Sequence, residues 1–145
     1  MEIGGLKWAT MNVGATSETD AGLYFQWGDT VGYTIDQVGD SEGKKKFTWD
    51  DYKWTEDGGV NMTKYNTTDG KTTLDLEDDA ARVNWRGDWR MPTYDEIQRF
   101  SENVNASWTY DYNNTGVQGL VCVDKQDTSK VLFFPITGKI TNGNK

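Results

Sequence analysis

The stretch between Gly28 and Gly70 constrains the fold of this chain more than any other segment. It is rich in Gly, Asp, Asn, Thr and Lys, and a structureless loop of that length is uncommon inside a compact domain. We therefore expect an irregular but ordered region whose aromatic rings pin it onto a core. These isolated aromatic residues are Phe47, Trp49, Tyr52, Trp54 and Tyr65.

The composition allows one compact core. Hydrophobic residues make up only 35% of the 145 residues, but 7 Trp, 7 Tyr and 5 Phe are present. Aromatic side chains bury large areas for each residue, so a few of them can replace many aliphatic ones. We expect residues 1–145 to form a single domain.

Several classes of function are excluded by residues that the chain lacks or has in excess. Without His, and with Cys122 as the single cysteine, it offers neither a Ser-His-Asp triad nor a Cys-His pair, and no His or Cys₄ zinc site. The formal charge of −8 opposes binding to nucleic acid phosphates. No apolar run approaches the roughly 20 residues of a membrane span, so direct membrane insertion is not expected.

The first predicted helix begins near Leu76. Asp75 can cap it, and acidic residues occupy its first turn, where the helix dipole favours negative charge. Asp78 lies four residues before Arg82, and we expect the two to pair. Arg82 and Arg90 are interpreted as organising partners of this acidic helix start.

The second predicted helix follows Thr93. Thr93 and Glu96 have the spacing of a capping box, in which each side chain satisfies a backbone donor of the other. Apolar residues spaced three and four apart predict the buried face of the helix. That face would contain Tyr94, Ile97, Phe100 or Ser101, and Val104.

In the remaining segments, apolar and polar residues alternate, or apolar residues form short runs; both patterns are typical of strands. The helices stand together between strands, which is the α+β pattern. We expect two helices packed on a small twisted, mostly antiparallel sheet, with a long ordered loop region. The predicted strands cover residues 6–13, 22–27, 107–112, 117–123 and 130–135, with 124–130 as a hairpin loop.

Four segments carry a combined motif that is more specific than any of them alone. They are Lys7-Trp-Ala-Thr-Met-Asn-Val-Gly-Ala15, Tyr24-Phe-Gln-Trp-Gly-Asp29, Thr73-Leu-Asp-Leu-Glu-Asp-Asp-Ala-Ala-Arg82 and Trp89-Arg-Met-Pro-Thr-Tyr-Asp-Glu96.

Over residues 5–135 these segments resemble the Fibrobacter succinogenes major paralogous domain family. That family is similar to formylglycine-generating enzymes and to the variable proteins of diversity-generating retroelements. The resemblance implies a C-type-lectin-like fold and an exported protein of Bacteroidetes or related gut bacteria. Family members continue further at the C-terminus, so we expect residues 136–145 to be truncated or atypical and to leave a sheet edge exposed.

The acidic residues near the first helix have two interpretations. They could bind Ca²⁺, which takes six to eight oxygen ligands, with Asp75 and Asp79 as candidates. Alternatively they form a dipole-compensated helix start, which we favour because successive helical residues point in different directions. The calcium signatures of sugar-binding C-type lectins are absent, and no cofactor is expected.

Aromatic residues with polar neighbours are the better candidates for a binding site, because they combine flat apolar faces with amide and hydroxyl groups. The alternative is that they form the core. Trp8, Trp27, Trp85 and Trp89 are expected to be packing residues. The candidate ligand-binding residues are Trp54, Tyr65, Trp108, Tyr110, Tyr112 and Asn113.

The sequence therefore predicts a non-catalytic binding module of a cell-surface or secreted protein, which recognises a glycan or a protein. Two alternatives stay open. One is a glycan-directed hydrolase that uses paired carboxylates. The other is a self-associating, adhesin-like or fimbria-like domain that forms a homo-oligomer through the exposed sheet edge.

Overall fold

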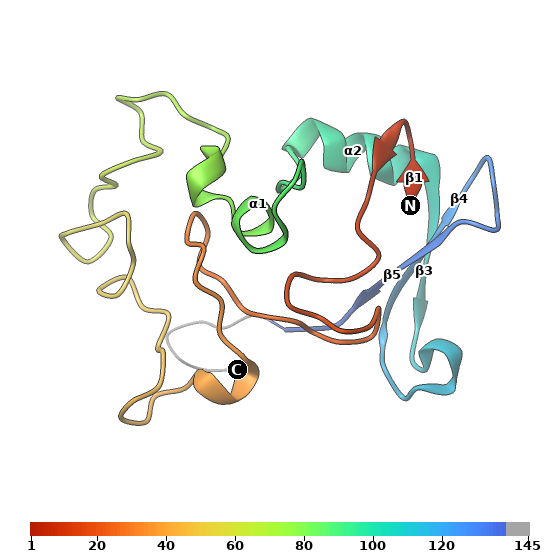
Figure 1. Ribbon diagram of the computed structural model, residues 1–145, viewed down its shortest axis with the longest axis horizontal. Helices are drawn as coiled ribbons and strands as arrows, with labels where there is room; N and C mark the ends of the chain where they lie inside the picture. Colours follow the sequence, from red (N-terminus) through yellow and green to blue (C-terminus); the bar gives the residue numbers. More distant parts are fainter. Residues whose placement is uncertain (139–145) are drawn as a thin grey trace. The chain divides into compact units, whose positions relative to one another are not determined.

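The computed structural model describes residues 1–138 and has an α+β fold with two helices and small antiparallel sheets (Figure 1). The described chain groups into two compact units. The first combines Met1–Gly22 with Pro92–Thr137, and the second contains Leu23–Met91. The expectation of a single domain over residues 1–145 stays a prediction, and its last part, residues 139–145, lies outside the described residues.

The first unit contains a three-stranded antiparallel sheet in the order β3, β4, β5. The strands are β3 (Val104–Thr109), β4 (Gly119–Asp124) and β5 (Val131–Pro135). They confirm the three predicted C-terminal strands and the hairpin loop between the last two, in which the Asp124 amide donates to the Lys130 carbonyl at 3.0 Å. β3 begins and ends earlier than the strand predicted for residues 107–112. The end of that predicted strand, Tyr112, instead belongs to a 3₁₀ turn, η3 (Tyr112–Asn114).

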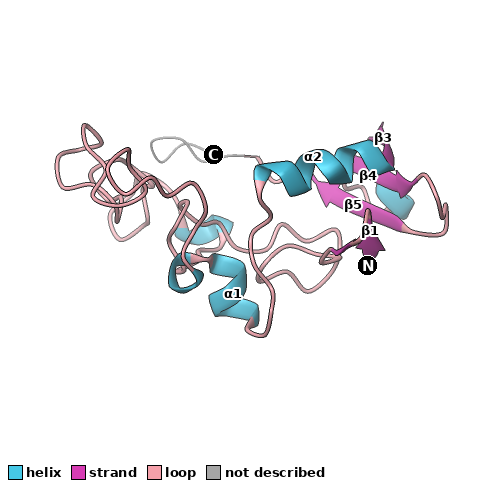
Figure 2. Ribbon diagram, turned by 90° about the horizontal axis from the view of Figure 1, so that it is seen from above, coloured by secondary structure: helices cyan, strands magenta, loops and turns pink. Residues whose placement is uncertain are grey.

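Helix α2 (Tyr94–Asn103) lies over one face of this sheet (Figure 2). The capping box of Thr93 and Glu96 is formed as predicted, and the chain passes from the helix directly into β3. Phe100 is buried from the helix, whereas Tyr94 and Ile97 are exposed, so the predicted buried face is correct only in its second half. The core combines Ile3, Phe100, Val104, Cys122 and Leu132, with Trp8 packed against it.

The N-terminus forms a short hairpin, not the long strand predicted for residues 6–13. β1 (Glu2–Ile3) pairs with β2 (Leu6–Lys7) through a two-residue turn. Gly4 and Gly5 make this turn with φ of 60° and 79°, values that L side chains rarely adopt. Residues 9–13 have no strand partner among the described residues, and their alternation alone does not hold them extended.

The second unit is mostly irregular, as the polar composition predicts. Its short elements are the 3₁₀ turns η1 (Ile35–Gln37) and η2 (Leu76–Asp78) and the helix α1 (Ala80–Trp85). The strand predicted for residues 22–27 is wrong: only an isolated bridge between Tyr24 and Tyr33 forms there.

The α-helix α1 begins four residues later than predicted because Asp79, not Asp75, caps it. Asp79 accepts hydrogen bonds from the Ala81 and Arg82 amides at 2.9 and 3.1 Å, and Asp75 makes no cap bond. Asp79 also accepts a third hydrogen bond, from the Met91 amide at 2.7 Å, which ties the segment after the helix to the start of the helix. Within residues 1–138, no helix has the length and apolar character that crossing a membrane requires.

The core predicts a sharp contrast between two positions of α2. Phe100 is buried and its ring contacts those of Trp8 and Phe134 at 4.7 and 5.8 Å. Phe100→Ala should lower the free energy of unfolding by about 3–5 kcal/mol because it leaves a cavity. Ile97→Ala, at a half-exposed position of the same helix, should cost less than about 1 kcal/mol. Urea unfolding followed by circular dichroism measures both, and equal losses would contradict this packing.

Candidate functional site

The predicted ligand-binding residues fall into two groups in different units. Trp108, Tyr110, Tyr112 and Asn113 belong to the first unit, and Trp54 and Tyr65 belong to the second. Each group is described by itself.

In the first unit, three large apolar side chains form a row across the sheet. Trp108 of β3 lies opposite Leu120 of β4, and Leu120 lies opposite Phe134 of β5. Residues opposite each other in an antiparallel sheet share a face, so the three side chains stand on one surface. They are 45%, 37% and 41% exposed. We call Trp108, Leu120 and Phe134 the apolar row.

The apolar row continues the face that carries the core. Cys122 lies two residues from Leu120 along β4, and Leu132 lies two residues from Phe134 along β5. Both therefore lie on the same face as the row, and both are buried in the core. The ring of Phe134 touches that of Phe100, yet all three residues of the row remain more than a third exposed. An apolar sheet face therefore runs from the core out to solvent.

Tyr110 extends the apolar row. Its ring is 75% exposed and lies 6.2 Å from that of Trp108 at a steep angle. The following turn is fixed by backbone bonds, because the Tyr112 amide donates to the Val117 carbonyl at 2.9 Å. Asn113 lies exposed in this turn with φ of 50°.

Tyr112 is a packing residue. Its ring stacks on that of Phe133 with centroids 3.9 Å apart and an interplanar angle of 1°. Its hydroxyl donates to the Glu18 carboxylate at 3.4 Å. Burial, together with the charge of Glu18, raises the pKa of Tyr112 above its usual range. Tyr112 thus packs against the sheet, whereas its neighbour Tyr110 is exposed.

In the second unit, Trp54 and Tyr65 belong to a hydrogen-bonded aromatic cluster. The Trp54 ring lies 5.5 Å from that of Tyr65, and Trp27 contacts Tyr65 from 4.9 Å. The Trp54 indole donates to the Gly28 carbonyl at 2.9 Å. Gly28 is required there, because its φ is +73° and a Cβ would lie 2.6 Å from the indole nitrogen.

A buried carboxylate lies at the centre of this cluster. Asp78 accepts hydrogen bonds from Lys53 at 3.1 Å, from Lys64 at 2.5 Å and from the Tyr65 hydroxyl at 2.6 Å. Both ammonium groups also lie over the face of the Trp54 ring, at 4.5 and 5.1 Å from its centroid. Burial alone would raise the pKa of Asp78, but the three donors outweigh it and lower that pKa to about 2.

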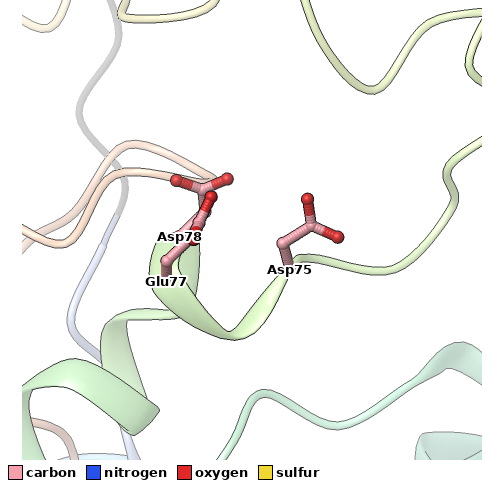
Figure 3. A group of neighbouring side chains, drawn as sticks. All are labelled: Asp75, Glu77 and Asp78. Atoms are coloured by element: carbon pink, nitrogen blue, oxygen red, sulfur yellow. The ribbon is translucent and has the colours of Figure 1, made fainter.

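The acidic residues before α1 come together around one lysine. Figure 3 shows the carboxylates of Asp75, Glu77 and Asp78, which lie within 4.8 Å of one another. The Lys64 ammonium lies 2.8, 3.8 and 2.5 Å from them. It stands where a bound cation would contact all three groups, and its bonds to Asp75 and Asp78 raise its pKa. Asp79 is not part of this group, because its carboxylate holds backbone amides.

The predicted pair of Asp78 and Arg82 does not form. Asp78 turns to Lys53 and Lys64, while the Arg82 guanidinium lies 3.5 Å from Asp88 and donates to the Gly87 carbonyl. Arg90 donates to the Met91 carbonyl at 3.2 Å.

The four expected packing tryptophans take part in ring contacts. Trp8 meets Phe100, and Trp85 meets Trp89 at 5.6 Å. Trp27 and Trp89 are nevertheless partly exposed rather than sealed in a core.

Leu120, Phe134, Lys53 and Lys64 were not predicted as members of either site. The alternation in the two C-terminal strands signals which residues share the face of Cys122, and it could have identified Leu120 and Phe134. The lysines carry no such signal, since they lie in irregular loops far from Asp78 in sequence.

Comparison of the chain with known protein families, with curated proteins and with solved structures finds no significant match. The geometry of the two sites therefore carries the functional argument.

The Asp78 network predicts a pH-dependent contribution to stability. A carboxyl whose pKa is lowered in the native state stabilises it above the usual pKa of 3.8 and loses that effect as pH falls toward 2. Asp78→Asn should lower the free energy of unfolding at pH 7 by about 2 kcal/mol, with a smaller difference from wild type near pH 2.

Glu77→Gln is the matched control. Glu77 is exposed, and its carboxylate lies 3.8 Å from the Lys64 ammonium, farther away than the carboxylate of Asp78. It should change stability by less than about 0.5 kcal/mol. Urea unfolding at several pH values measures both variants. A loss for Asp78→Asn that is the same at pH 7 and pH 2 would show that the carboxylate charge is not what stabilises the loops.

The position of Lys64 also predicts the response to calcium. We expect Ca²⁺ to leave the melting temperature unchanged, because the Lys64 ammonium group already occupies the position between the three carboxylates. Thermal unfolding with and without the ion measures this, with magnesium as a control for ionic strength. A saturable rise in melting temperature that Asp75→Asn abolishes would contradict the expectation.

Proposed function

We propose that this chain is a non-catalytic binding module that recognises a protein ligand through the apolar row and Tyr110. The supporting observation is the exposure of the row itself: Trp108, Leu120 and Phe134 stand side by side on one face of a regular sheet. Contiguous exposed apolar side chains mark interaction sites more often than single ones do.

The composition of this surface favours a protein over a glycan. Aromatic anchors such as Trp and Tyr dominate the binding energy of many protein interfaces. Leu120 and Phe134 add apolar area without a hydrogen-bonding group, which suits an apolar side chain better than a sugar hydroxyl. Trp108 and Tyr110, with Asn113 in the following turn, are also compatible with a glycan, and the experiment below includes one.

The proposal of a module without catalysis is supported by the state of the acidic groups. The three clustered carboxylates are bound to Lys64, and the lowered pKa of Asp78 keeps that residue ionised near neutral pH. A general acid of a glycosidase needs the opposite, a carboxyl whose pKa is raised.

A C-type-lectin-like fold and a place on the cell surface or in the surroundings of a gut bacterium remain part of the proposal. They rest on the resemblance of the four sequence segments described above. The α+β architecture is compatible with that fold.

The proposal predicts that binding depends on the apolar row. Wild-type protein would be screened against immobilised glycans and a panel of extracellular proteins, and the strongest binder would be used with the variants. Trp108→Ala and Tyr110→Ala should each weaken binding about tenfold or more, since each removes an aromatic anchor worth over 1.4 kcal/mol.

Trp49→Ala is the control, because Trp49 is even more exposed than Trp108 but belongs to the second unit. It should leave the affinity unchanged. If all three variants bind as wild type does, or if Trp49→Ala alone fails, the apolar row is not the recognition surface. If a glycan is the strongest binder, the ligand is a glycan and not a protein. If the protein also releases a product from that glycan, it is an enzyme and not a binding module.

A further inference from the structure

β3 is an edge strand with an unprotected outer edge. It pairs with β4 on one side, and no strand pairs with its other side among residues 1–138. Asn105, Ala106, Ser107 and Trp108 are all exposed. Edge strands usually carry charges, Pro or bulges that prevent pairing with another chain, but β3 has neither a charged residue nor Pro.

The register shows which backbone groups of β3 are free. The Lys125 amide donates to the Asn103 carbonyl at 2.9 Å, next to the pair of Val104 and Asp124. In an antiparallel ladder, hydrogen-bonded pairs alternate with pairs that exchange no bonds. Ser107 therefore directs its amide and carbonyl toward β4, whereas Ala106 and Trp108 direct theirs outward.

These outward groups belong to the residues that carry the apolar face. Ala106 and Trp108 lie two positions apart, so their side chains share the face of Leu120 and Phe134. In the described part of the chain, no hydrogen-bond partner meets their backbone groups on the outer edge.

We propose that β3 pairs antiparallel with β3 of a second copy of this chain, with Ser107 of one copy opposite Ser107 of the other. In this register Trp108 of each copy lies opposite Ala106 of its partner, a large side chain against a small one, twice. The free amides and carbonyls of both residues then bond across the junction. The two sheets become one, with an apolar row from each copy on the same face.

The chemistry of the strand favours a second copy as the occupant. The pairing is self-complementary, as a two-fold interface requires. No charged residue lies within Val104–Thr109, so no like charges meet directly across the junction. The rest of the first unit is acidic, with nine Asp or Glu against four Lys or Arg, so the copies repel at longer range and salt should strengthen their association.

The inference goes beyond the proposed function, because it concerns the backbone edge and is tested without a ligand. Sedimentation equilibrium over a wide range of concentrations should show the mass of wild-type protein rising from one chain to two, more readily at high NaCl. Ser107→Lys should weaken the dimer about tenfold or more, because it places two ammonium groups opposite each other. Ser107→Asp should do the same.

A mixture of the Ser107→Lys and Ser107→Asp variants should restore the dimer, since opposite charges then face each other. The matched control is Asn105→Lys. Asn105 is exposed on the same face of β3 as Ser107, but this register places it opposite Thr109 of the second copy. It should dimerise like wild type, and circular dichroism should show that all variants fold. A wild-type chain that stays monomeric throughout, or a mixture that does not dimerise, would overturn the proposal. Equal effects of Ser107→Lys and Asn105→Lys would overturn the register.

Discussion

The irregular part of this protein depends on aromatic side chains that pack and donate hydrogen bonds to the backbone at the same time. The Trp54 indole bonds the Gly28 carbonyl, and the Tyr52 hydroxyl bonds the Trp27 carbonyl at 2.8 Å. Such a ring excludes water from a loop and also satisfies a carbonyl that no strand or helix pairs. In a chain with few aliphatic residues, this double role takes the place of regular secondary structure. The buried charge of Asp78 depends on it, because the Trp54 ring covers the lysines that neutralise that charge.

The sequence predicted the parts of the fold that follow from local rules. Thr93 and Glu96 defined the start of α2 because capping involves residues three apart, and the apolar runs defined β4 and β5 because both strands pair with their neighbours in sequence. The prediction failed where a partner distant in sequence decides the outcome. Residues 9–13 alternate like a strand but find no strand partner in the described structure. Asp75 has the residue type of a cap, yet its carboxylate is taken by Lys64 and Lys71.

The candidate sites show the same division. Choosing aromatic residues with polar neighbours selected Trp108 and Tyr110, which are exposed, but the same rule also selected Tyr112, Trp54 and Tyr65, which pack. Exposure depends on what covers each ring, and Phe133 covers Tyr112 from a strand about twenty residues away. Charge pairing was the least predictable part. Arg82 was the obvious neighbour of Asp78 along the helix, but lysines 14 and 25 residues away reach that carboxylate instead.

The burial of Cys122 has a consequence for how copies of this chain can meet. The thiol is 2% exposed in the core of the first unit, and burial raises its pKa, so little reactive thiolate forms. It is the chain's single cysteine, and while the fold stays intact it cannot reach another molecule. Oxidising surroundings would therefore not lock two folded copies together through sulfur, and any joining of their sheets would remain reversible.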